Sequence, residues 1–190
     1  TVRAAENFQI SDLKAASFFK TALALVKLSA AQTNCKLRII TKKQETAIIK
    51  AAQEFIAGKF DQDFTLDIFQ AGAGTSYNMN INEILANRAN EILGGKKGTY
   101  EFVHPNDHVN QSQSTNDVIP TASRVAALLA ISGLLKELKT TTNEFAKIAK
   151  KESKTLKVGR THLQDAVPIT LGQEFDSYKE ALTKTATMIE

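Results

Sequence analysis

Apolar residues recur every three or four positions over most of this sequence. One such run covers residues 11–37, where the apolar side chains include Leu13, Ala16, Phe19, Leu23 and Val26. That spacing places them on one face of a helix, which can then pack against a core. We therefore predict a helix over this segment, within a mainly α-helical protein.

Two further helices are indicated by their ends. Residues 41–58 open with Thr41 and carry Gln44 three positions later, which is the pattern of a capping box, and Gly58 is a typical helix stop. Residues 81–93 repeat the helical spacing and end at a pair of glycines. Between these helices Phe64, Leu66 and Ile68 alternate with other residues, which predicts an extended segment too short to imply a sheet.

The longest pattern runs from residue 118 to about residue 150. A helix of about thirty residues is far above the usual length of about eleven or twelve. Between Val125 and Leu135 the pattern is apolar nearly all round, which indicates burial within a bundle or between subunits. We predict an N-terminal helical domain over residues 1–116 and the incomplete beginning of a long-helix bundle over residues 117–190.

Composition narrows the class of protein. The 190 residues are 43% hydrophobic and 23% charged, and the net charge is only +4. The basic residues follow helical faces without interleaved aromatics, so we expect no nucleic-acid partner. The single cysteine excludes an internal disulfide, and no signal peptide is evident, which suits the cytoplasm. We expect no apolar run long enough to cross a bilayer, and hence no membrane partner.

The first of three polar segments is "QAGAGTSYNMN", residues 70–80. Gly72 and Gly74 allow the backbone to bend tightly and to approach a ligand. Thr75 and Ser76 then supply neutral hydrogen-bond donors ahead of a helix. The segment lacks the Lys-Ser/Thr ending of a phosphate loop, and alone it is also typical of a glycine-rich turn with capping residues.

The second polar segment is "HPNDHVNQSQSTND", residues 104–117, which contains no lysine or arginine. It ends immediately before the long helix in four polar residues, Ser114, Thr115, Asn116 and Asp117. A helix start presents unpaired N–H groups and a positive dipole end, and capping needs only one such residue. Four in a row favour a bound anion. The two histidines lack the cysteines or second histidine pair of a zinc site, so we expect no metal.

The third polar segment is "GRTHLQDAVPITLGQEF", residues 159–175. Thr161 and His162 precede Pro168, and Thr170 is placed to cap a helix from about residue 171. A lone histidine at a helix junction is more often structural than catalytic. Three donor-rich loops on a helical protein nevertheless suit a small dicarboxylate, because hydroxyls and amides can surround its charge without ion pairs.

Together with "TVRAAENFQIS" at the start, these segments resemble the first two signature regions and the second-site loop of the fumarase/aspartase superfamily. The resemblance covers the whole chain. It implies a mostly helical homotetramer with a central five-helix bundle and active sites each built from three subunits. Members eliminate ammonia, water or another group from a succinyl compound to give fumarate, and we expect no cofactor.

The resemblance also implies roles for individual residues. The expected binders of the substrate carboxylates are Thr75, Ser114, Thr115 and Asn116. Thr161 and His162 resemble a pair that reaches in from another subunit, Thr161 to bind substrate and His162 as a catalytic candidate, since an imidazole titrates near neutral pH. The loop called the second, or B, site in fumarases is matched by His104, Pro105, Asn106 and Asp107.

One signature of this family is missing. Its Gly-Ser-Ser motif, with the serine thought to be the base, would lie beyond Glu190. We therefore expect an N-terminal fragment that is inactive alone. Within the family the "GAGTS" form favours an ammonia-lyase acting on L-aspartate, whereas "HPNDHVN" also occurs in fumarases, so a fumarate hydratase is the alternative. An alternative of another class is a catalytically silent structural relative or a helical interaction module.

Overall fold

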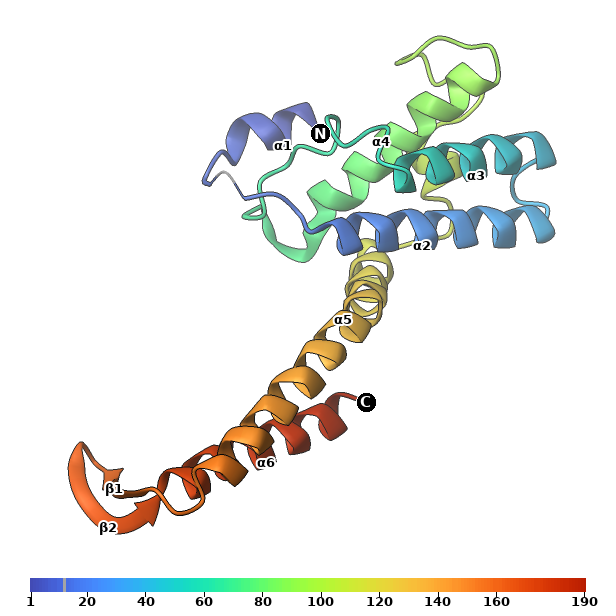
Figure 1. The fold of residues 1–190 in the computed structure, drawn as a ribbon. Helices are drawn as coiled ribbons and strands as arrows, with labels where there is room; N and C mark the ends of the chain where they lie inside the picture. The colour runs from blue at the N-terminus through green and yellow to red at the C-terminus, as the bar shows by residue number, and fades with distance from the viewer. Residues whose placement is uncertain (12) are drawn as a thin grey trace. The chain divides into compact units, whose positions relative to one another are not determined.

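Helices make up most of the chain in the computed structural model, which describes residues 1–11 and 13–190 (Figure 1). The described residues form two compact units, Thr1–Leu129 and Ala130–Glu190. The elements in chain order are α1 (Val2–Asn7), α2 (Ser17–Lys36), α3 (Lys42–Ile56), the short helical turn η1 (Gly72–Gly74), α4 (Thr75–Ile92), the π-helical turn η2 (Pro105–Val109), α5 (Thr115–Lys151), β1 (Leu156–Thr161), β2 (Gln164–Thr170) and α6 (Leu171–Ile189). The predicted mainly α-helical class is confirmed.

The core of the first unit lies among α2, α3 and α4. Figure 1 shows α2 and α3 side by side, and α3 also packs against α4. Each helix contributes fully buried side chains to a single cluster, among them Leu23, Ile48, Ile81 and Leu85. Burying one such side chain contributes about 1.5–3 kcal/mol, so this cluster holds the three helices together.

The predicted helix caps are present. At the start of α3 the Thr41 hydroxyl accepts the Gln44 backbone N–H at 3.3 Å, and the Gln44 side chain accepts the Thr41 N–H at 2.9 Å. Gly58 follows the helix with φ +82°, in the left-handed region that favours glycine. A second capping box starts α6, where the Thr170 hydroxyl accepts the Gln173 N–H at 3.1 Å. Local sequence therefore determines these three helix ends.

The first long helix begins later than its apolar spacing suggests. α2 starts at Ser17 rather than at residue 11, although Asp12 lies outside the described residues. The Ser11 hydroxyl donates to the Asp67 carboxylate at 3.2 Å, and Lys14 forms an isolated antiparallel bridge with Asp67. These contacts with Asp67 hold Ser11 and Lys14 in a non-helical conformation. The spacing of apolar residues cannot predict such long-range contacts.

The segment predicted as extended lies over the core and forms no strand beyond that bridge. Phe64 and Leu66 are buried, whereas Ile68 is exposed. The Phe64 ring stacks on Tyr77 with centroids 5.7 Å apart, and the Tyr77 hydroxyl donates to the Asp67 carbonyl at 2.8 Å. Phe64 and Leu66 thus close the core beside α4, and Ile68 does not take part.

α5 has 37 residues, which confirms the predicted long helix. Within this chain its apolar middle is open to solvent, with Leu128 67% and Leu134 50% exposed, so burial in a bundle stays a prediction. By length and composition α5 could cross a membrane. The expectation that no apolar segment is long enough to cross a bilayer therefore does not hold by length and composition. The core helix of a soluble protein can meet the same two criteria. The domain boundary predicted at 116/117 also stays a prediction.

The second unit contains a hairpin and the returning helix α6. β1 pairs antiparallel with β2. The Phe145 ring of α5 packs against Phe175 of α6, with centroids 5.6 Å apart. At the start of α6, a Cβ on Gly172 would lie 2.5 Å from the Ala149 carbonyl oxygen and 2.8 Å from the Ser153 Cα. The two helices therefore approach so closely at their hairpin end that only glycine fits.

We expect Gly172→Ala to destabilise the second unit, because backbone atoms of Ala149 and Ser153 cannot move aside. Overpacking of this kind costs about 1–3 kcal/mol. Gly133→Ala is the matched control, because a Cβ there meets nothing within 4 Å and the residue is helical, which predicts a gain of about 0.5–1 kcal/mol. Thermal unfolding of the 190-residue chain, followed by circular dichroism, measures both. Equal midpoints for the two variants would contradict the proposed close approach.

Candidate active site

The glycine-rich loop before α4 lies directly against α5. Gly74 has φ +74°, and a Cβ there would lie 2.9 Å from the Ile119 Cγ1 atom. Any larger residue would be strained and would push the loop away from α5. Thr75 follows as the first residue of α4, six residues earlier than predicted, and its side chain is exposed. The sequence "GAGTS" therefore places Thr75 at the start of α4, next to α5.

A buried amide joins the starts of α4 and α5. The Asn78 side chain is 2% exposed, and its Nδ2 donates to the Thr115 Oγ1 at 3.1 Å. Thr75 precedes Asn78 by three residues and lies on the same face of α4. The structure thus brings two of the polar segments together, the one beginning α4 and the one beginning α5.

Polar residues cap and surround the start of α5. The Ser114 Oγ accepts the Asn116 backbone N–H at 3.3 Å, and the Ser114 carbonyl accepts the N–H groups of Asp117 and Val118 at 3.0 Å each. The side chains of Ser114 and Asn116 are exposed, whereas Thr115 is half-buried. Ser114 therefore serves as the cap, and the polar side chains beside it stay accessible at the positive end of a long helix dipole. Such an end favours a carboxylate.

The predicted second-site loop forms η2, which packs against α4. His104 precedes it, and its Nδ1 accepts the backbone N–H groups of Asn106 and Asp107 at 3.3 Å each. The His104 N–H donates to the Nδ1 of His108 at 2.8 Å. Burial lowers the pKa of His108, while the nearby Asp107 carboxylate acts in the opposite direction. Both imidazoles thus hold the turn, while Asn106 and Asp107 are exposed and Pro105 is buried.

Thr161 and His162 lie in the second unit, at the tip of the hairpin. Thr161 ends β1 and pairs with Gln164 of β2. Between them His162 and Leu163 turn the chain, both at positive φ. The Thr161 Oγ1 lies 3.1 Å from the His162 Nδ1, and both side chains are exposed. The third polar segment therefore contains a hairpin that presents these two side chains at its tip.

Sequence reasoning missed a buried network behind Thr115. Lys27 of α2 is 0% exposed, and its Nζ donates to the Asn110 Oδ1 at 2.8 Å and to the Gln113 Oε1 at 3.1 Å. The Asn78 Nδ2 also donates to the Asn110 Oδ1, at 3.1 Å. Both acceptors of the ammonium are neutral amides, and burial lowers the pKa of Lys27 to about 7. The one sequence signal is a lysine on the buried apolar face of α2.

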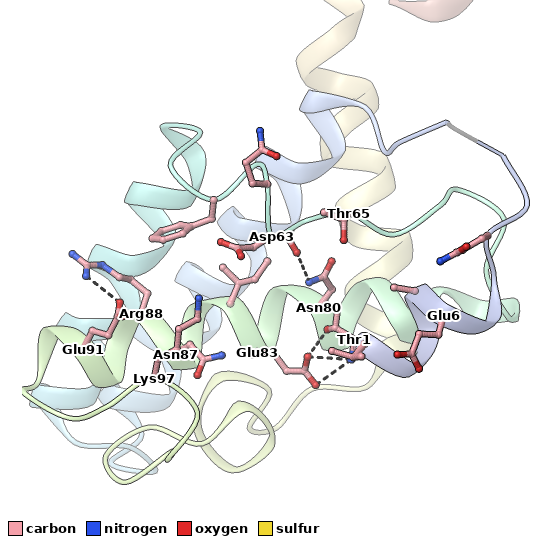
Figure 2. A pocket seen from close by; sticks show the side chains of 16 residues that line it. Thr1, Glu6, Asp63, Thr65, Asn80, Glu83, Asn87, Arg88, Glu91 and Lys97 are labelled. Carbon is pink, nitrogen blue, oxygen red and sulfur yellow. Dashed lines mark hydrogen bonds and ion pairs between the residues drawn. The ribbon is translucent and has the colours of Figure 1, made fainter.

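Two hollows flank α4 in the first unit. One, of about 420 Å³, is drawn in Figure 2, where Asn80 points toward Asp63 and Glu83 toward Thr1. It includes none of the predicted site residues. The other, of about 890 Å³, is lined in part by Arg3, Thr75 and Ser76. The donors at the start of α4 therefore border the second hollow and not the first, whereas Ser114, Thr115 and Asn116 at the start of α5 line neither.

No group of three or more His, Cys, Asp or Glu residues that could hold a metal ion occurs among residues 1–11 and 13–190. What the helix starts do offer is a set of neutral donors beside two helix N-termini. Such an arrangement can bind carboxylates and stabilise negative charge that develops on them.

A family model described as "Lyase" matches residues 1–190. The chain belongs to the fumarase/aspartase superfamily of lyases. It is 46% identical over 184 residues to an aspartate ammonia-lyase of a Bacillus species, covering 97% of this chain and 39% of the relative. It is 48% identical over 191 residues to a class II fumarate hydratase of Photorhabdus laumondii, covering 100% of this chain and 41% of the relative.

Solved structures agree with this superfamily assignment. A fumarate lyase:delta crystallin from Brucella melitensis superposes with a TM-score of 0.86 at 46% identity, covering 98% of this chain and 44% of that chain. A class II fumarase from Schistosoma mansoni superposes with a TM-score of 0.84 at 38% identity, covering 98% and 40%. This lyase chain thus spans less than half the length of these relatives. Its sequence identity to the ammonia-lyase is similar to its identity to the fumarate hydratase, so identity alone does not distinguish these two activities.

We expect Lys27 to make the stability of this lyase depend on pH. The unfolded chain keeps the ordinary lysine pKa of 10.5, whereas the folded state has about 7, so the unfolded state binds more protons between these values. The stability contributed by Lys27 therefore rises as pH rises from 7 toward 10. Thermal midpoints of the full-length protein and its Lys27→Met variant, measured across this range, test the point. As pH rises, the thermal midpoint of the parent should increase relative to that of the variant. If the difference between the two midpoints stayed constant or became smaller, Lys27 would not titrate in this range.

Proposed function

We propose that the full-length protein is an aspartate ammonia-lyase, which reversibly eliminates ammonia from L-aspartate to give fumarate. The observation that carries this proposal is the start of α5. There Ser114, Thr115 and Asn116 stand together without a basic residue, beside the first turn of α4 and its Thr75.

The chemistry of the elimination explains why neutral donors would be placed there. Removing the proton next to a carboxylate creates an aci-carboxylate with two negative charges. Donors that are already aimed at those oxygens bind this state more strongly than the substrate and so lower the barrier. A base takes a proton from the β-carbon, the electron pair left behind forms the C=C bond of fumarate, the bond between the α-carbon and nitrogen breaks, and the amine leaves as ammonia. We assign the carboxylates to Thr75, Ser114, Thr115 and Asn116.

The remaining groups would come from elsewhere in the assembly. In the proposed homotetramer, Thr161 and His162 at the hairpin tip reach into the site of a neighbouring subunit, Thr161 to bind substrate and His162 to orient or protonate a group. The base is the serine of the family's third signature, beyond Glu190. His104, Pro105, Asn106 and Asp107 form a second site. We further propose a cytoplasmic enzyme that needs no cofactor.

The choice of aspartate rests on the loop that carries Thr75. "GAGTS" at residues 72–76 is the form that resembles ammonia-lyases, whereas fumarases usually carry glutamine after the threonine. The alternative is a fumarate hydratase, because "HPNDHVN" also occurs in fumarases and a class II fumarate hydratase is equally similar to this chain. A silent structural relative is a weaker alternative, since capping α5 needs only Ser114 and leaves its polar neighbours unexplained.

We expect Ser114→Ala and Asn116→Ala to slow turnover of the full-length protein strongly. Loss of one pre-aimed donor at comparable sites costs about 100- to 1000-fold in rate. Thr41→Ala is the matched control, because it removes a helix cap far along the chain from these residues and should cost only about 1 kcal/mol of stability. Steady-state kinetics and thermal midpoints are measured for all three. If Ser114→Ala behaved like Thr41→Ala, Ser114 would be a cap and nothing more.

The substrate itself is tested directly. We expect the full-length protein to produce fumarate from L-aspartate, followed by its ultraviolet absorbance, and to leave L-malate unchanged. The physical reason is the first loop, whose Ser76 replaces the glutamine typical of fumarases. Ser76→Gln is the informative variant and should reduce turnover of aspartate. Turnover of malate alone by the parent would instead make this protein a fumarate hydratase.

A further inference from the structure

The buried network behind Thr115 has a fixed donor direction. As an ammonium the Nζ of Lys27 has three N–H donors and no acceptor, and as a neutral amine it still has two N–H donors, enough for the two oxygen atoms that it faces, the Asn110 Oδ1 and the Gln113 Oε1. Asn110 must therefore present its Oδ1 to Lys27, at 2.8 Å. The other end of the same amide agrees, because the Asn110 Nδ2 donates to the Gln113 carbonyl at 3.1 Å. Lys27 thus decides which way the Asn110 amide points.

That orientation determines the next amide. Since the Asn110 Oδ1 is an acceptor, Asn78 must turn its Nδ2 toward it, at 3.1 Å. The second hydrogen of the same NH₂ group is directed to the Thr115 Oγ1, also at 3.1 Å. The hydroxyl oxygen of Thr115 is therefore an acceptor within the network, and its own hydrogen stays available for another partner. A carboxylate oxygen is such a partner.

Asn78 keeps one polar atom of its amide unpaired, so its orientation depends on the groups on its paired side. Asn78 is 2% exposed, and its Oδ1 is buried with no hydrogen-bond partner among the described residues. Rotating the amide by half a turn would let this oxygen accept the Thr115 hydroxyl, but it would move the Nδ2 into the buried position that has no partner. An unsatisfied buried acceptor costs about 1–3 kcal/mol. The rotation would also leave the Asn110 Oδ1 without the Asn78 donor and take the Thr115 hydrogen away from a ligand.

We propose that Lys27 is a positioning residue for the substrate site: through Asn110 and Asn78 it holds the Thr115 hydroxyl as a donor toward a substrate carboxylate. The inference deepens the proposed function and rests on it. Lys27 itself touches no substrate, and its effect on turnover passes entirely through Thr115.

The test is a double-mutant cycle in the full-length protein. Lys27→Met removes the ammonium with little change in length, and Thr115→Val removes the hydroxyl with little change in shape. We expect each single variant to lower kcat/KM by about 100-fold, as small misplacements of binding groups do. The double variant should be no slower than Thr115→Val alone, because only one hydroxyl is lost in either case. The substrate used is whichever of L-aspartate or L-malate the parent turns over.

Leu23→Ala is the matched control, because Leu23 is also fully buried on α2, one turn before Lys27, and its apolar side chain can make no hydrogen bond to the network. It should lower the thermal midpoint and leave kcat/KM unchanged. If Lys27→Met does not fold, Asn78→Leu takes its place in the cycle, since it removes the same link.

Additive losses in the double variant would overturn the positioning role, and so would a Leu23→Ala variant as slow as Lys27→Met. A Thr115→Val variant with the parent's kcat/KM would overturn the carboxylate site itself, and with it both proposals. The two failures are therefore distinguishable: the first leaves Thr115 important and Lys27 independent of it, whereas the second removes Thr115 from the site.

Discussion

The contact between the beginnings of α4 and α5 is the constraint on which the candidate site depends. It needs a loop that passes α5 closely enough for a Cβ at Gly74 to lie 2.9 Å from Ile119. It also needs a buried amide, Asn78, to reach Thr115. With both in place, two helix N-termini and their polar residues share one region, so both dipoles would act on a charge bound there. A longer or bulkier loop would leave two separate capped helices.

Much of the fold could be predicted from sequence because local rules govern it. The capping boxes at Thr41 and Thr170 and the stop at Gly58 each depend on residues within one turn. Features that depend on tertiary contacts could not be predicted from these local rules. α2 starts late because Ser11 and Lys14 are bound to the segment around Asp67, which is far along the chain. No helical period carries that information.

The candidate site shows the same division. Its exposed polar residues could be proposed from sequence, because several polar residues in a row at a helix start are unusual, and their role in binding stays a prediction. The network beneath them could not be predicted, because apart from its place on the apolar face of α2 nothing in the sequence distinguishes Lys27 from an exposed helix lysine. Only the structure shows that Lys27 is fully buried and bonded to Asn110. The tip of the hairpin was also missed as a hairpin. Its two-residue turn has no glycine, and His162 and Leu163 both adopt positive φ, which residues of these types rarely do.

A layer of neutral donors with one cation behind it suits a site in which charge must appear during the reaction. A lysine or arginine in direct contact with the carboxylates would also bind the full charge of the substrate strongly, and the part of that binding shared by substrate and transition state does not raise kcat. Hydroxyls and amides held in one orientation respond instead to charge that develops on the oxygens they face. The burial that lowers the pKa of Lys27 to about 7 also keeps water from competing for its hydrogen bonds. In the proposed site, the energetic cost of burying Lys27 would fall on a residue that does not contact the substrate, and Lys27 would fix the direction of the donors that face the substrate.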